Sequence, residues 1–353
     1  MGAVKRNGNV EVFRCFLMFL IVLWHCYVHG FYHSSTEWWT ELYPLFLMWH
    51  VDGFVAISGW FGIRFAWSKV LRLYGVILLY SIASICVRLL FAPETFKLKH
   101  LTVTGGWFGG TYLGLMFLAP LINRGLDTLL SESKKRVYAV FGLFVAVVTL
   151  AWIPTHLFTA VVPSGSGGYT IFTMIFVYSA AYLVRRVEIN ASARLVTGIA
   201  GVCCLFTIAL SLGYSMLRVV SGCEFELIAF KCSYDSPFVW GLAIALLMLF
   251  VRHIRFPDWL CKTSSFIGPS TFCIYLLHDT TSFGQSLYRI PETWLSQHTS
   301  WHPMLIILLC SVSTFLICLA VDLLRRAAFS FVRPRVTHVL QRIDERWDLW
   351  LAK

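Results

Sequence analysis

Residues 13–26, FRCFLMFLIVLWHC, form an apolar run with an arginine near its start and a histidine near its end. With its neighbours the run reaches about 20 residues, the length of a helix that crosses the hydrocarbon core of a bilayer. The stretch therefore predicts a membrane-spanning helix over about 12–31. It also raises the question of why Arg14 and His25 lie inside that helix.

The composition extends this prediction to the whole chain. Of its 353 residues, 58% are hydrophobic and 13% are charged, whereas a soluble domain usually has about 25% charged residues. No segment follows the pattern of a cleavable signal peptide, so we expect the first helix to be retained. The predicted fold class is an all-α polytopic membrane protein with a membrane domain over 1–325 and a cytoplasmic tail over 326–353.

Apolar segments between charged or turn-rich breaks give about ten candidate transmembrane helices. They lie near 12–31, 43–63, 70–92, 106–123, 137–155, 169–184, 195–216, 235–251, 265–287 and 303–324.

The distribution of Lys and Arg supports this count. If the N-terminus is cytoplasmic, the inner segments hold 23 of the 29 Lys and Arg residues, as the positive-inside rule requires. The six others are Arg88, Lys97, Lys99, Arg218, Lys231 and Arg289. We therefore expect both termini in the cytoplasm. The net charge of +11 indicates orientation in a membrane, and we expect no binding to nucleic acid.

The tail RVTHVLQRIDERWDLWLAK, 335–353, has apolar residues at helical spacing among Arg and Asp. This pattern predicts an amphipathic helix that lies on the cytoplasmic surface of the lipid bilayer.

Arg14 and His25 are eleven residues apart, which places them about 16 Å apart along a helix and within about 20° of the same face. Arg14 would lie at the cytoplasmic end and His25 deeper in the membrane. Ionisable residues inside a membrane usually face an interior cavity and have a function. The alternatives are an interfacial anchor for Arg14 and a structural hydrogen bond for His25.

A second polar group lies in HVDGFVAISGWFGIRFAWSKVLRLYG, 50–75. Asp52 is in an apolar setting, and Ser58 with its neighbouring glycine permits close helix approach. Arg64, Lys69 and Arg72 follow on the predicted cytoplasmic side, where they suit a polyanionic ligand. The alternative is ordinary positive-inside charge.

A third group lies in GPSTFCIYLLHD, 268–279. Tyr275 and His278 share a helical face, and Asp279 is turned about 100° from His278. A role in chemistry and a role in hydrogen bonding between helices are both open.

The eleven cysteines do not form a disulfide framework, because most lie in predicted spans, where Cys acts as a small apolar residue. Pairing of Cys223 with Cys232 in a predicted outer loop is open. No cysteine pair has zinc-site spacing with histidines, and we expect no metal.

Four stretches resemble the integral-membrane acyltransferase 3 family, which includes bacterial polysaccharide O-acetyltransferases. NVEVFRCFLMFLIVLWHC resembles its opening helix with the Arg-x10-His motif, here Arg14 and His25. DGFVAISGWFGIRF resembles the FFxxSGyf signature, and WFGGTYLGLMFLAPLIN, which begins at Trp107, resembles WFxxxYlxLYllsPxLN. STFCIYLLH, 270–278, resembles giYLiH. The four stretches occur in family order over almost the whole chain.

The resemblance implies transfer of an acyl group, usually acetyl from acetyl-CoA, to a hydroxyl of a carbohydrate or lipid-linked glycan in a bacterial cytoplasmic membrane. His25 would act as general base or acyl relay, because imidazole titrates near neutral pH. Arg14, Arg64, Lys69 and Arg72 would hold the donor, and attack on a thioester requires no metal. Asp52, Ser58, Trp107, Tyr275 and His278 would line a pocket or be structural.

The sequence departs from the family pattern in two places, one among the cations expected to hold the donor and one in a segment expected to line a pocket. The family's Arg-x-x-Arg is Lys69-x-x-Arg72 here, and its LYL is GLM at 114–116.

Two other functions fit the same composition. A transporter or flippase would use Arg14, His25 and His278 to line a substrate or proton path. A catalytically inactive family member would serve as a sensor or assembly partner. The pattern does not indicate the acceptor sugar or the oligomeric state.

Overall fold

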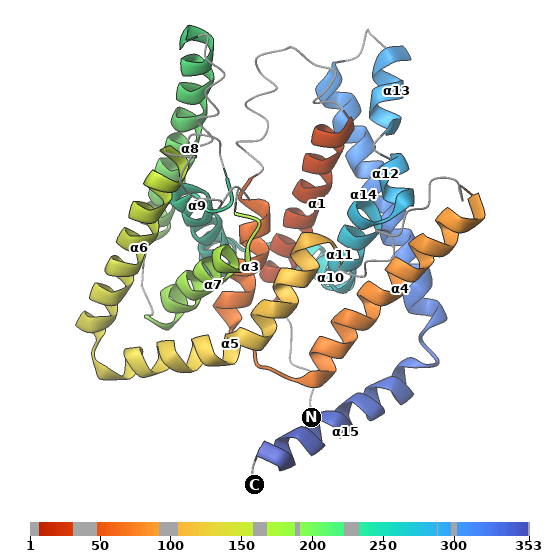
Figure 1. Ribbon diagram of the computed structural model, residues 1–353, viewed down its shortest axis with the longest axis horizontal. Helices are drawn as coiled ribbons and strands as arrows, with labels where there is room; N and C mark the ends of the chain where they lie inside the picture. Colours follow the sequence, from red (N-terminus) through yellow and green to blue (C-terminus); the bar gives the residue numbers. More distant parts are fainter. Residues whose placement is uncertain are drawn as a thin grey trace. The chain divides into compact units, whose positions relative to one another are not determined.

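A computed structural model describes residues 7–30, 48–91, 105–157, 168–187, 191–221, 233–287, 289–297 and 302–351. All regular secondary structure in these ranges is helical, which confirms the predicted all-α class (Figure 1). The chain divides into two compact units, which share three helices. Unit 1 contains residues 1–20, 35–63 and 118–265, and unit 2 contains residues 21–34, 64–117 and 266–353.

Five of the described helices are long and apolar enough to cross a membrane. They are α1 (Gly8–Gly30), α4 (Trp67–Phe91), α5 (Gly106–Glu132), α8 (Ala193–Ser221) and α14 (Pro303–Ala328). Each coincides with a predicted span, so five of the predicted spans are helices whose length and composition suit a membrane crossing. These helices indicate a membrane protein, whereas the ten-span count and the cytoplasmic termini stay predictions.

The other predicted spans correspond to shorter, interrupted or differently composed helices. Residues 43–47 of the second segment lie outside the described residues, and the rest forms α3 (His50–Phe61). The fifth, sixth and eighth segments form α6 (Lys134–Leu157), α7 (Ile171–Arg186) and α9 (Pro237–Met248), the last continued by the π-helical turn η6 (Leu249–His253).

The ninth segment, 265–287, is not one continuous helix. It contains the end of α10 (Asp258–Ile267), the 3-10 turn η7 (Gly268–Ser270), α11 (Thr271–Tyr275), the π-helical turn η8 (Leu276–Thr280) and α12 (Ser282–Leu287). The chain leaves the helical path at Thr281, whose backbone is extended. This break positions the side chains of η8.

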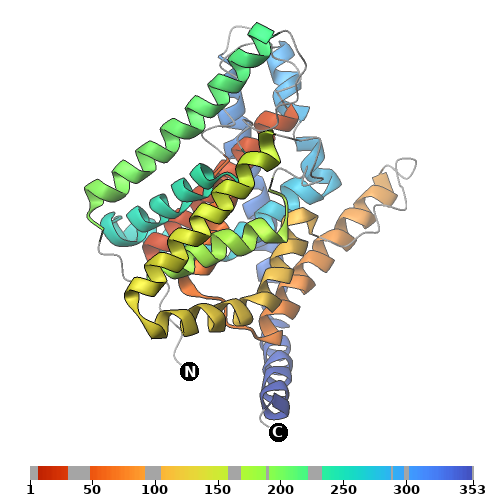
Figure 2. The ribbon, with the colours of Figure 1, turned by 60° about the vertical axis from the view of Figure 1, so that its left-hand side comes forward.

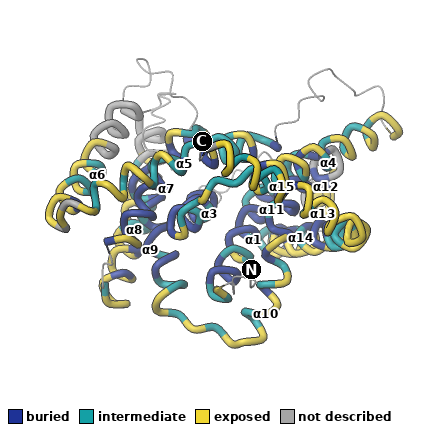
Figure 3. The backbone as a smooth tube through the Cα atoms, turned by 90° about the horizontal axis from the view of Figure 1, so that it is seen from below, coloured by how far each residue is buried: buried dark blue, intermediate teal, exposed yellow. Residues whose placement is uncertain are grey.

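Unit 1 is built around α3, which packs against α7 and α9, while α8 runs along α9 (Figure 2). Buried residues concentrate on α3, α7 and α9 (Figure 3). Two glycines of α3 make this packing possible. A Cβ at Gly53 would lie 2.6 Å from the Leu17 side chain, and one at Gly59 would overlap the carbonyl of Tyr178 in α7.

Unit 2 joins α4, α11, η8, α12 and α14, and it also holds α13 (Arg289–Gln297). A buried carboxylate connects α14 with α4. Asp322 in α14 is fully buried, accepts a 2.7 Å hydrogen bond from Arg325 Nε of the same helix, and accepts a 2.8 Å bond from the Tyr80 hydroxyl of α4. Arg325 balances the buried charge, which would be costly without a partner, and the bond from Tyr80 joins the two helices.

Large apolar side chains cover the outward faces of the long helices. The exposed residues include Leu78, Ile82 and Leu90 in α4, Leu205 and Phe206 in α8, and Leu309 and Leu316 in α14. Soluble monomers rarely expose such continuous apolar surfaces. These faces suit contact with lipid chains.

The tail forms α15 (Arg333–Leu351), so the predicted amphipathic helix is present as a helix. It packs against α4 within unit 2. Its location on the membrane surface stays a prediction.

Candidate functional site

The second unit brings together two of the sequence-predicted site residues, His25 and His278. Nδ1 of His25 lies 2.9 Å from Nε2 of His278, although the two residues are far apart in the sequence. The His278 side chain is fully buried, and that of His25 is 16% exposed. Of the two uses considered for His278, hydrogen bonding between helices is therefore observed.

A backbone carbonyl determines which nitrogens carry protons in this pair. Nδ1 of His278 lies 2.6 Å from the carbonyl oxygen of Ile274. A carbonyl only accepts, so neutral His278 must carry its proton on Nδ1 and leave Nε2 as an acceptor. His25 must then donate through Nδ1, which leaves Nε2 of neutral His25 without a proton. The chain of hydrogen bonds thus leaves His25 with an unprotonated Nε2 nitrogen that is able to accept a proton.

Asp279 completes this group, which we term the His25–His278 cluster (His25, Ile274, His278 and Asp279). Its Oδ1 atom lies 3.7 Å from Nδ1 of His25. A carboxylate at this distance would stabilise a positive charge on His25 if Nε2 took up a proton. Asp279 is turned about 100° from His278 on a regular helix, and this angle alone did not predict its contact with His25.

Close packing holds the cluster in place. A Cβ on Gly284 of α12 would overlap the carbonyl of His278, so only glycine allows α12 to approach η8 this closely. The hydroxyls of Thr280 and Thr281 donate to the carbonyls of Leu276 and Leu277. These bonds satisfy the local backbone of η8 at its end.

Tyr275 and the start of α5 pack beside His278. The ring of Tyr275 packs edge-on against His278, with centroids 6.0 Å apart, and edge-on against Phe108 at 5.9 Å. Gly106 has a φ of 68°, and a Cβ there would overlap the hydroxyl of Tyr275. Trp107, the residue before Phe108, packs edge-on against the Phe108 ring, with centroids 5.9 Å apart, and so helps to hold Phe108 against Tyr275.

Arg14 lies on α1, the same unbroken helix as His25, but its immediate partner was missed. Its Nη1 atom lies 2.8 and 3.0 Å from the two carboxylate oxygens of Glu11, one turn earlier. Glu11 is buried and belongs, like Arg14, to unit 1. The i, i+3 spacing of Glu11 and Arg14 was the available signal in the sequence.

Three predicted donor-binding cations belong to unit 2: Arg64 precedes α4, and Lys69 and Arg72 lie in its first two turns. Arg64, Lys69 and Arg72 are all exposed. Nζ of Lys69 donates a 2.9 Å hydrogen bond to the carbonyl of Arg64. The backbone N–H of Ser68 donates a 3.0 Å bond to Asp344 of α15, so an acidic side chain already lies at this helix start.

Asp52 and Ser58 are both part of α3 in unit 1. Asp52 is buried in the first turn, and the Ser58 hydroxyl donates a 3.2 Å bond to the carbonyl of Phe54. Gly59 provides the close helix approach, as its contact with the Tyr178 backbone shows.

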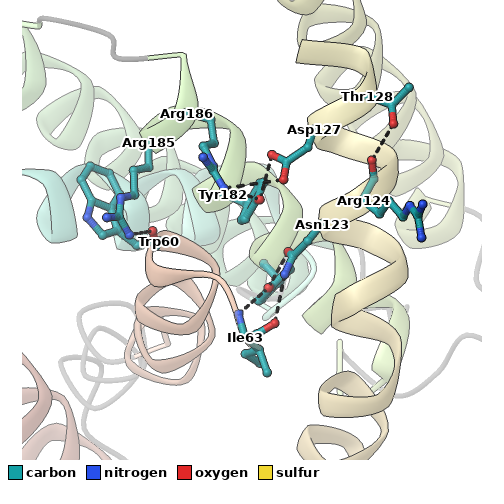
Figure 4. Close-up of polar contacts among 10 residues, drawn as sticks. Trp60, Ile63, Asn123, Arg124, Asp127, Thr128, Tyr182, Arg185 and Arg186 are labelled. Carbon is teal, nitrogen blue, oxygen red and sulfur yellow. Dashed lines mark hydrogen bonds and ion pairs between the residues drawn. The ribbon is translucent and has the colours of Figure 1, made fainter. Parts of the chain in front are cut away.

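The residues after α3 are fixed by a ring of hydrogen bonds that the sequence reasoning did not find (Figure 4). The N–H of Ile63 donates to the Tyr178 hydroxyl at 2.8 Å, and this hydroxyl donates to Asn123 Oδ1 at 2.7 Å. Asn123 Nδ2 then donates to the carbonyl of Ile63 at 3.0 Å. Asn123 is the last residue of the stretch that begins at Trp107, so its position in the motif was the available signal.

Two arginines at the end of α7 complete this arrangement (Figure 4). Arg185 donates a 2.5 Å hydrogen bond to the carbonyl of Trp60, an acceptor at the end of α3. Arg186 donates at 3.0 Å to the Tyr182 hydroxyl, which itself donates at 2.9 Å to Asp127. The bond to Tyr182 raises the pKa of the Arg186 guanidinium, which therefore remains charged. These contacts assign Arg185 and Arg186 to structural roles at helix ends.

Within the described ranges, no group of three or more His, Cys, Asp and Glu side chains is arranged to hold a metal ion. The nine cysteines in those ranges are free thiols. Cys223 and Cys232 lie outside the described residues.

Comparison with known proteins adds one match. The acyltransferase 3 family model, described as an acyltransferase domain, matches residues 7–323 and thus most of the chain. No curated protein and no solved structure shows significant similarity to the chain.

Proposed function

Since the chain belongs to the acyltransferase 3 family, we propose that it moves an acetyl group from acetyl-CoA to a hydroxyl of a cell-surface or lipid-linked carbohydrate. Family membership establishes acyltransferase activity as the general function and agrees with the apolar helices. We propose four further details: acetyl-CoA as the donor, a carbohydrate as the acceptor, a topology of ten spans, and a location in the bacterial cytoplasmic membrane.

One observation carries the proposed role of His25, namely the hydrogen-bond chain from the Ile274 carbonyl through His278 to His25. This chain leaves Nε2 of His25 as the basic nitrogen. A general base needs this state and a fixed ring orientation. His278 acts here as a positioning residue, because it determines the tautomer of His25 and does not itself contact the reacting atoms.

In the proposed reaction, the acceptor hydroxyl gives its proton to Nε2 of His25 while its oxygen attacks the thioester carbonyl carbon. The carbon–sulfur bond then breaks, and the proton on Nε2 passes to the departing sulfur. The products are an acetyl ester and the free thiol of CoA. During the step His25 is positively charged, and Asp279 lies at 3.7 Å to stabilise that charge.

The acyl-relay alternative uses the same nitrogen. Nε2 of His25 would attack the thioester, release CoA, and hold the acetyl group until the acceptor hydroxyl takes it. Incubation of the protein with labelled acetyl-CoA and no acceptor separates the two routes. Label that remains on the wild-type chain and is lost in His25→Ala supports the relay, and its absence supports direct transfer.

On the donor side, Arg14, Arg64, Lys69 and Arg72 are proposed to hold the phosphates of CoA or to polarise the thioester carbonyl. Their support is the chemistry of Arg and Lys, which pair well with phosphate. We expect Lys69→Ala and Arg72→Ala to raise the KM for acetyl-CoA while the protein remains in the membrane. An unchanged KM in both variants would reject this assignment.

The central experiment measures ester-linked acetyl groups on the surface glycans of cells that contain the intact gene, a deletion or His25→Ala. We expect the acetyl ester to disappear in both mutant strains while membrane levels of the variant match those of the wild type. Glycans with equal acetylation in every strain would argue against this acceptor class and favour the transporter alternative.

A further inference from the structure

Helix α15 carries an apolar stripe that its packing in unit 2 covers only in part. At about 100° per residue, Val336, Val339, Ile343, Trp347 and Trp350 lie within about 80° of one another. Trp347 packs edge-on against Trp67 of α4, with ring centroids 5.6 Å apart. At the other edge of the stripe, Val339 and Trp350 are 56% and 65% exposed, and Val336, about 20° from Trp347, is 46% exposed.

Most charges of α15 are grouped by sign around the helix. Arg335, Arg342 and Arg346 lie within about 40° of one another, next to the exposed apolar edge. Asp344 and Asp348 lie on the opposite side together with Arg333, and Glu345 lies between the two groups. A helix with an apolar stripe and a basic edge suits a surface that is both apolar and negatively charged.

Contacts with α4 fix the rotation of α15 about its own axis. Asp344 accepts a 3.0 Å hydrogen bond from the backbone N–H of Ser68, one of the donors left free at a helix start. Together with the contact between Trp347 and Trp67, this bond turns the acidic side toward α4. The basic edge, with Val339 and Trp350 beside it, is therefore turned away from α4.

The connection to α14 keeps this helix close to the bilayer. α14 is a candidate membrane span that ends at Ala328, and α15 begins at Arg333. Four linking residues reach at most about 15 Å. Phe331 in this link is 86% exposed, so it adds an apolar side chain on the same side of the membrane.

We propose that α15 binds the surface of a leaflet rich in anionic phospholipid, with Arg335, Arg342 and Arg346 on the headgroups and Val336, Val339 and Trp350 at the acyl boundary. This lipid-binding face lies beyond residue 323, where the family match ends. It depends on α14 spanning the membrane but not on the proposed acyl transfer.

The test is amide hydrogen–deuterium exchange of the full chain in nanodiscs of phosphatidylcholine alone or with added phosphatidylglycerol. We expect exchange in 333–351 to slow by roughly tenfold when the anionic lipid is present, because each arginine near such a surface adds to binding. The double variant Arg342→Glu/Arg346→Glu should lose this dependence on lipid charge.

The matched control is Lys135→Glu/Arg136→Glu in α6, which makes the same change in net charge and should leave exchange in 333–351 dependent on the anionic lipid. Equal exchange in both lipid compositions for the wild type would overturn the proposal. So would a lipid-dependent slowing that persists in Arg342→Glu/Arg346→Glu, because the anionic lipid would then act on the helix through residues other than these arginines. Since the readout is local exchange, failure of this test is distinct from failure of the acyltransferase proposal.

Discussion

At the level of single residues, His278 controls His25 through one hydrogen bond. We expect His278→Phe to remove the acceptor for His25 Nδ1 and to lower kcat by about 10²- to 10⁴-fold, as loss of correct general-base function does. His278→Gln offers a side-chain oxygen as acceptor and should retain more activity. The measurement is acetyl transfer by purified protein over a range of pH, with kcat and KM determined separately.

His29 provides a matched control for that substitution. Its ring centroid lies 5.7 Å from that of His25, but it lies outside the hydrogen-bond chain through Ile274 and His278. His29→Phe should therefore change kcat by less than about threefold, which corresponds to under 1 kcal/mol in the barrier. Similar losses in His29→Phe and His278→Phe would indicate a general packing effect and contradict the tautomer argument.

Sequence reasoning identified the ionisable members of this cluster, His25, His278 and Asp279, but not the hydrogen bonds that connect them. These residues stand out, as Arg14 does, because ionisable residues are rare in apolar helices. The tautomer of His25 depends on the carbonyl of Ile274, and a backbone acceptor leaves no signal in the side-chain pattern. The partner of Arg14 was predictable in principle, since Glu11 lies one helical turn away.

At the level of elements, the crossing of α3 and α7 depends on one glycine. We expect Gly59→Ala to destabilise the protein by about 1–3 kcal/mol, because the added Cβ meets the Tyr178 backbone, which has no alternative rotamer. The measurement is the Tm of purified protein in detergent.

Gly198 in α8 gives the control for this change. A Cβ there has no neighbour within 4 Å. Gly198→Ala should leave the Tm unchanged or raise it, since alanine favours a helix by up to about 1 kcal/mol over glycine. A Tm for Gly59→Ala that equals or exceeds that of Gly198→Ala would show that the two helices can separate without cost.

Apolar segments predicted where helices lie more reliably than they predicted whether a helix is continuous. The five long apolar helices coincide with predicted spans because about 20 apolar residues form a strong signal. The break after η8 was missed, although the polar residues from His278 to Ser282 were the available signal for it. Gly268 and Pro269 marked the η7 turn, and their positions in the sequence were the available signal for it.

For the whole molecule, we predict ten membrane crossings with both termini in the cytoplasm. Reporter proteins that are active only in the cytoplasm should be active when fused to residue 1 or to residue 353, since an even number of spans returns the chain to its starting side. An epitope inserted within 158–167 should be accessible only from outside.

An inactive reporter at the C-terminus beside an active one at the N-terminus would require an odd number of crossings and would contradict the charge-based topology.

Composition and charge were sufficient to predict the all-α membrane class. They did not separate the two compact units, because each unit is assembled from three distant parts of the chain and its packing depends on contacts between them.

The ion pair between Asp322 and Arg325 bears on where this chain can be shortened. A protein cut at residue 323, where the family match ends, would keep the buried Asp322 and lose Arg325. Removal of one partner from a buried ion pair costs about 3–5 kcal/mol, which is a large part of the stability of a typical domain. The same cut removes Asp344 and with it the acceptor for the Ser68 N–H. We therefore expect a chain that ends where the family match ends to be less stable than the full chain.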